Sequence, residues 1–291
     1  MTSATEMVRE ARTTYLMTGQ REARARLNTA MAADDLTMAL TNAMITPAIN
    51  QYYEVDWELM TAWSVAGSTV TVERGEEGTT PAIHTQGTVV TINPIFPRSR
   101  ILAAAQAELT SLSSDPTLWK PTVIELEGSR SDYTYDLGAI DVRGIAAVDI
   151  EDGTGNWTPL NMWTLKHGLT GQTGITGDVG LNIRNGVDGR TIRVVAKTPL
   201  PQITSTTADI ETTTGLPSAS LLAVGAALRL AAGREIKRTF IEGQGDTRRA
   251  NEVQPYQTMG STRNLEALYK RLRGEAQMAL SQKYPARRKR Q

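Results

Sequence analysis

Few side chains along this sequence could carry catalysis. The chain has 291 residues, two histidines and no cysteine, which excludes cysteine nucleophiles and histidine-rich metal sites. His84 closes the turn-rich stretch 74–83, and His167 precedes Gly168 at the start of a glycine series. These contexts predict surface-loop histidines, with a general base as the alternative role for each.

Carboxylates near Asp149 offer the other chemical possibility. The run Asp149-Ile150-Glu151-Asp152-Gly153 resembles half of a calcium loop but lacks the glutamate that would close it, so we expect a hairpin turn with outward carboxylates. Weak calcium binding stays open as an alternative. With no nucleophile elbow, zinc-protease motif, phosphate loop or dinucleotide fingerprint either, the sequence predicts no enzyme, no cofactor and no metal site.

The formal net charge of zero hides an asymmetry. Residues 234–291 hold 14 Lys and Arg against 6 Asp and Glu, a net charge of +8; since the chain has 31 of each, the other 233 residues carry −8. The positive region ends in Arg287, Arg288, Lys289 and Arg290. One interpretation is a solvated basic tail; the other is that this segment docks electrostatically on an acidic protein surface or contacts DNA phosphates. Any DNA contact would have no sequence preference, because no aromatic residues interleave the segment.

Hydrophobic periodicity predicts alternating helical and β regions. Helices are expected over 4–30, 98–113, 218–241 and 263–282, and short strands over 52–92 and 122–197. Glycines recur at every third position over 168–180, which predicts a long mobile loop or one ordered by a partner. Five residues are expected to pack helices together: Ala223, Ala227, Leu265, Leu268 and Leu272.

These elements predict an α+β fold, a discontinuous helical bundle with two β-rich insertions. One insertion is a small antiparallel β unit and the other is a sandwich-like or barrel-like β region. The expected domains are an N-terminal helical segment (1–33), a small β module (34–97), a bundle helix (98–118), a β insertion (119–215) and the C-terminal bundle helices with the basic tail (216–291). Neither a membrane span nor a signal peptide is expected.

Two segments resemble virion proteins of tailed phages, particularly those of actinobacteria. The first is similar to a structural β module shared by several virion components; it comprises Tyr53–Met60, then Thr69-Val-Thr-Val-Glu-Arg-Gly75, Gly78-Thr79, His84 and Gly87. The second, Gly215–Glu235, resembles the packing helix of head-to-tail adaptors of the neck. The resemblance implies a ring, with twelve copies, that joins the portal protein to a downstream connector or tail completion protein around the DNA channel. It implies a virion location, with assembly in the cytoplasm of the host bacterium.

Two other functions are compatible with the sequence. The shared module also permits a minor tail or baseplate structural protein. A glycan-binding or hydrolytic host-recognition protein would use Trp157, Trp163 and Tyr133 for stacking on sugars, with Asp149, Glu151 or Asp152 as acid and base.

Overall fold

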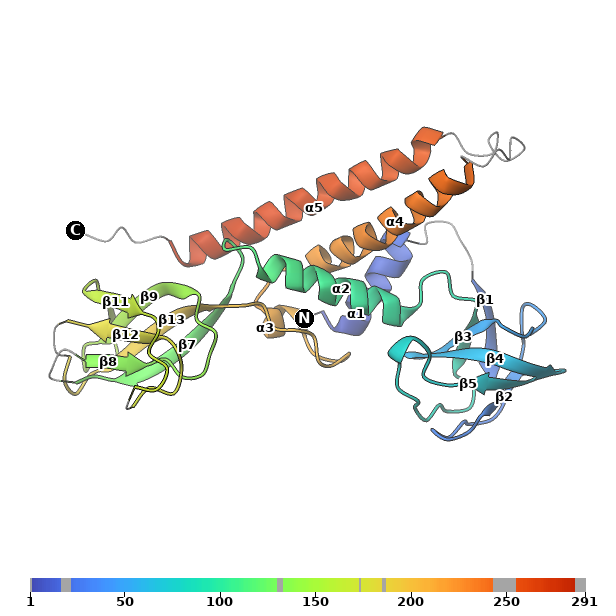
Figure 1. The fold of residues 1–291 in the computed structure, drawn as a ribbon, viewed down its shortest axis with the longest axis horizontal. Coiled ribbons are helices and arrows are strands. Elements are labelled where there is room, and N and C mark those ends of the chain that lie inside the picture. Colours follow the sequence, from blue (N-terminus) through green and yellow to red (C-terminus); the bar gives the residue numbers. More distant parts are fainter. Residues whose placement is uncertain are drawn as a thin grey trace. The chain divides into compact units, whose positions relative to one another are not determined.

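The computed structural model describes residues 2–16, 22–129, 133–172, 174–184, 187–242 and 255–285 (Figure 1). The chain divides into two compact units. The barrel unit comprises Thr5–Ala107 and Leu222–Tyr269, and the sandwich unit comprises Met1–Ala4, Glu108–Leu221 and Lys270–Gln291. The boundaries fall inside helices, so the chain passes between the units four times.

The barrel unit is built around a closed six-stranded barrel. Its helical elements and strands are α1 (Ala4–Glu10), a π-helical segment (Ala11–Leu16), β1 (Ala23–Leu27), β2 (Thr37–Thr41), β3 (Tyr52–Val55), β4 (Glu58–Ala66), β5 (Thr69–Glu73), β6 (Val89–Ile92) and α2 (Arg98–Ser113). The strand order is β1-β2-β5-β4-β3-β6, and antiparallel pairing of β1 with both β2 and β6 closes the barrel. Alternate residues of each strand point inward, such as Val70 and Val72, and form one apolar core.

The sandwich unit encloses a second core between two sheets. Its strands are β7 (Lys120–Glu127), β8 (Tyr133–Asp136), β9 (Gly144–Glu151), β10 (Trp157–Pro159), β11 (Trp163–Lys166), β12 (Gly180–Ile183) and β13 (Thr191–Thr198). They form a four-stranded sheet of order β10-β9-β13-β7 and a three-stranded sheet of order β11-β12-β8. After these strands the chain forms α3 (Ile210–Thr214), α4 (Ser220–Glu242) and α5 (Pro255–Lys283). Most of α4 and the first half of α5 belong to the barrel unit.

The predicted helical bundle with β insertions is wrong. Thirteen strands outnumber five α-helices among the described residues, and one apolar cluster fills the barrel while another lies between the sheets of the sandwich. Helical periodicity shows which face of a helix is apolar but not what that face packs against, so the sequence did not reveal that sheets form the framework. Many of the predicted elements are nevertheless confirmed, including β5 and α2 with the expected bounds.

The N-terminal helix ends much earlier than predicted. The segment Ala23–Leu27 is strand β1, not the continuation of a surface helix. Its Ala and Arg residues favour a helix locally, but their alternation buries Ala25 and Leu27 and exposes Arg24 and Arg26. Pairing with β6 and β2 outweighs the local preference.

The glycine series 168–180 is mostly exposed but makes defined contacts with the sandwich unit at a few positions. Gly168, Gly171 and Gly174 have positive φ, while a Cβ on Gly177 would lie 2.1 Å from the carbonyl oxygen of Gly138. Leu169 is buried, and its N–H donates to the carbonyl of Asp178. The glycines are therefore used for turns and a close backbone approach. The described residues before Gly180 form the predicted long loop, and its ordering by a partner stays a prediction.

Candidate functional site

A buried carboxylate, Glu58, organises the module that carries the resemblance to virion proteins. Glu58 is the first residue of β4 and is 1% exposed. Arg74 donates from Nε to its Oε1 at 2.7 Å and from Nη2 to its Oε2 at 2.6 Å, and the Ala82 N–H donates at 3.0 Å. Burial alone would raise the pKa of Glu58, but the hydrogen bonds from Arg74, His84 and Ala82 outweigh it and lower that pKa.

Arg74 ties several loops to this carboxylate. Besides its two hydrogen bonds to Glu58, its guanidinium donates to the backbone carbonyls of Ala32, Asp35 and Ala82. A buried Arg–carboxylate pair is stable only when its remaining hydrogen bonds are satisfied, and here carbonyl groups of two loops satisfy them. The pair therefore fixes the loops at this end of the barrel.

His84 belongs to the same cluster, so the predicted surface histidine is wrong at this position. It is 1% exposed, with Nε2 2.9 Å from Oε2 of Glu58 and Nδ1 3.0 Å from Oδ2 of Asp56. The preceding loop is held by Thr79, whose hydroxyl accepts from the Leu59 N–H and donates to the Glu76 carbonyl. Gly75 has φ +72°, and a Cβ there would lie 3.0 Å from the Thr79 carbonyl. His167, by contrast, is exposed as predicted.

A second buried ion cluster joins the N-terminal helix to the barrel. Arg12 donates to Glu22 at 2.6 Å and to Glu54 at 2.7 Å, and all three residues are at most 9% exposed. Glu22 also accepts from the Ile95 N–H, and Glu54 from the Arg98 N–H. Burial alone would lower the pKa of Arg12, but the two carboxylates raise it above its ordinary value.

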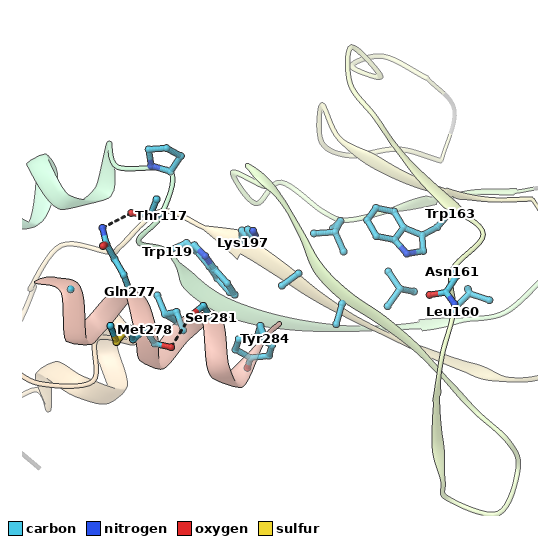
Figure 2. A pocket seen from close by; sticks show the side chains of 17 residues that line it. Thr117, Trp119, Leu160, Asn161, Trp163, Lys197, Gln277, Met278, Ser281 and Tyr284 are labelled. Atoms are coloured by element: carbon cyan, nitrogen blue, oxygen red, sulfur yellow. Dashed lines mark hydrogen bonds between the residues drawn. The ribbon is translucent and has the colours of Figure 1, made fainter. Parts of the chain in front are cut away.

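An aromatic cavity of about 720 Å³ opens in the sandwich unit between α5 and strands β9 and β13 (Figure 2). The Trp119 and Tyr284 rings lie 5.3 Å apart between centroids, and Nζ of Lys197 lies 5.1 Å from the Trp119 centroid. Trp163, another lining residue, packs against the sandwich core. None of the described residues that line the cavity is an aspartate or glutamate.

Asp115 anchors α5 next to this cavity. Its carboxylate accepts from the N–H and hydroxyl of Thr117, from Arg273 at 2.5 Å and from Gln277 at 3.4 Å. Burial alone would raise the pKa of Asp115, but the hydrogen bonds from Thr117 and Arg273 outweigh it and lower that pKa to about 2. The ionised carboxylate thus holds α5 on the connection between α2 and β7.

We expect Asp115→Asn to lower the free energy of unfolding of the sandwich unit by about 1–3 kcal/mol at pH 7, because charge-assisted hydrogen bonds are lost. A carboxylate with a lowered folded-state pKa stabilises above its unfolded pKa, and the stabilisation disappears as the pH falls through the folded value. The difference between wild type and variant should therefore shrink between about pH 4 and pH 2. Urea unfolding over this pH range measures it; a difference that stays constant would contradict the role of the charge.

Asp149 and Asp152, two of the three carboxylates expected to act in sugar hydrolysis, are engaged in structural contacts. Asp149 lies 3.4 Å from Nη2 of Arg193, whose guanidinium lies 4.2 Å from the Trp157 ring centroid. Asp152 accepts from Thr154 and Asn156 within the β9–β10 turn, so the predicted hairpin is confirmed. No group of three or more potential metal ligands occurs within the described residues, and the side chain of Tyr133 is not among those described.

The structure describes the predicted packing residues but not the predicted docking residues. Arg287, Arg288, Lys289 and Arg290 lie outside the described residues. Ala223 and Ala227 are fully buried on α4. Leu265, Leu268 and Leu272 are half-buried on α5. No described helix is both long and apolar enough to cross a membrane.

Comparison of the sequence with protein-family models and with curated proteins gives no match. Sequence reasoning missed the Glu58 and Arg12 clusters, although signals for both were present. Glu58 shares its alternation with Met60 and Ala62, and Arg12 is four residues after Val8 on a helix, so each periodicity points to the interior.

Proposed function

We propose that this chain is a non-enzymatic structural protein of a tailed-phage neck. In this proposal a twelve-copy ring connects the portal protein to a connector or tail completion protein around the DNA channel. The main support is the way the module's charged residues are used. Glu58, His84 and the side chain of Arg74 are buried, and both Arg74 and His84 bond to Glu58. Charged residues bonded in this way maintain a barrel, which suits a structural role.

The barrel also offers apolar surface for assembly. Among the described residues, eight of the twelve large apolar side chains that are exposed lie between Leu36 and Val89; Trp63 is 72% exposed and Ile83 is 74% exposed. Exposed tryptophans are often the residues that contribute most to protein–protein binding. We infer that the barrel surface around Trp63 contacts a neighbouring copy or the portal.

The expected result is that purified protein forms a multi-copy complex with purified portal. Trp63→Ser should weaken this assembly at least tenfold, because truncating a central interface tryptophan typically costs 2 kcal/mol or more (about 30-fold). Mass photometry of the protein alone and with portal measures both. Val123→Ser is the matched control, since Val123 is 55% exposed on the sandwich; it should leave assembly unchanged.

Three outcomes would contradict the proposal or its details. A monomer indifferent to portal would overturn the neck role. Assembly with unchanged affinity for Trp63→Ser would remove Trp63 from the interface. Imaging of particles that lack the gene distinguishes a neck protein from a minor tail or baseplate protein. Tailless heads that leak DNA support the neck protein, whereas normal heads with defective tail tips identify the tail or baseplate protein.

A further inference from the structure

A second cavity, in the barrel unit, is lined by four arginines. Its volume is about 730 Å³, within the range of ordinary ligand pockets. Arg9, Arg12, Arg24 and Arg98 line it together with one carboxylate, Glu22. The remaining lining residues are small, hydroxylic or apolar: Thr5, Val8, Thr13, Met44, Val89 and Thr91.

The arginines reach the cavity from different elements. Arg9 lies on α1, where Thr5 and Arg9 are one turn apart and share a helix face. Arg24 lies on β1 and pairs with Thr91 of β6, which in turn pairs with Glu54 of β3. Because paired residues project from the same side of a sheet, Arg24 and Thr91 form a row on the outside of the barrel.

The charge inside this cavity is only partly balanced. Glu22 and Glu54 are both bonded to Arg12. Arg98 donates from Nη1 to the Asp56 carbonyl, and its Nε lies 4.0 Å from Glu54. Among the described residues, the Arg9 and Arg24 side chains have no hydrogen-bond or ion-pair partner. Two exposed guanidinium groups therefore face one cavity without a counter-ion from that part of the chain.

We propose that this cavity binds the phosphate group of a phosphate ester, with Arg9 and Arg24 as its ligands. A guanidinium presents paired N–H donors that match two phosphate oxygens, and two such groups on separate elements can hold one anion. The ester can be a mononucleotide or a phosphate of a DNA backbone, since both present the same group. The proposal stands on the cavity alone and does not depend on the neck role.

Arginine-directed labelling of the full-length protein tests the site directly. Phenylglyoxal modification, followed by peptide mass spectrometry, gives a rate for each arginine. Adenosine monophosphate or a 20-base-pair duplex should slow modification of Arg9 and Arg24 at least fivefold. Arg184 and Arg190 of the sandwich unit are exposed and serve as internal controls; their rates should not change. Protection by the mononucleotide identifies a site for the isolated group, and protection by the duplex alone identifies a backbone contact; either supports the proposal.

A charge-matched pair of variants supplies the second readout. Arg9→Gln/Arg24→Gln and Arg184→Gln/Arg190→Gln each remove two positive charges from exposed positions. The first should weaken duplex binding at least tenfold and reduce the slope of log K against log salt by about 2, as expected for two lost phosphate contacts. The second should leave both unchanged. Equal protection of all four arginines, equal weakening by both variants, or no protection by either ligand would overturn the proposal.

Discussion

Glu58→Gln should lower the stability of the barrel more than any surface substitution in this chain. The amide keeps the shape of the carboxylate but leaves Arg74 buried without its counter-ion and directs an NH₂ group toward donors of Arg74 or His84. Removing one partner of a buried ion pair typically costs about 3–5 kcal/mol. Hydrogen exchange followed by mass spectrometry should show faster opening of β3, β4 and β5 peptides, with sandwich peptides as the internal reference.

The pH dependence of the same variant isolates the charge. Because the folded-state pKa of Glu58 is lowered, its stabilisation is fully present above the unfolded value of about 4.3 and is lost as the pH falls through the folded value. Wild-type barrel stability should therefore fall below about pH 4, and Glu58→Gln should lack that component. Glu73→Gln is the matched control, since Glu73 ends β5 in an exposed position; its effect should stay within about 0.5 kcal/mol. Equal destabilisation by both substitutions would contradict the role given to Glu58.

Four of the six barrel strands, β3 to β6, could be predicted because local signals agree with the tertiary structure there, whereas β1 and β2 were missed. In Thr69–Glu73, which lies between turn residues, apolar valines alternate with polar threonine and glutamate residues. The predicted bounds of this strand are confirmed. In strand β1, which is rich in Ala and Arg, the local sequence favours a helix whereas the tertiary structure requires a strand. Its pairing partners β2 and β6 lie at different distances along the sequence, so only the closed barrel determines its conformation.

The candidate sites were harder to predict because they depend on long-range neighbours. His84 stands in a turn-rich sequence, yet its partners Asp56 and Glu58 are 28 and 26 residues away. The arginines of the barrel-unit cavity come from α1, the π-helical segment, β1 and the start of α2. Composition indicated a basic C-terminal segment as the charged contact, whereas the described residues place two unpaired arginines near the N-terminus. Net charge by segment does not show which charges share a surface.

Arg12→Met should destabilise the barrel unit by about 3–5 kcal/mol, because Glu22 and Glu54 would remain buried without a cation. The triple variant Arg12→Met/Glu22→Gln/Glu54→Gln should recover most of that loss, since each new amide oxygen can still accept from the Ile95 or Arg98 N–H. Chemical unfolding monitored by hydrogen exchange of β1 and β3 peptides measures all variants.

Arg9→Met provides the control on the same helix, since Arg9 is exposed, and should change stability by no more than about 0.5 kcal/mol. A triple variant as unstable as Arg12→Met alone would show that the loss comes from packing of the Arg12 side chain. Recovery in the triple variant would show that Arg12 is needed to neutralise the two buried carboxylates, and that the fold tolerates loss of the whole ion cluster. Arg12 would then be a structural cation, which leaves Arg9 and Arg24 as the arginines available to an external anion.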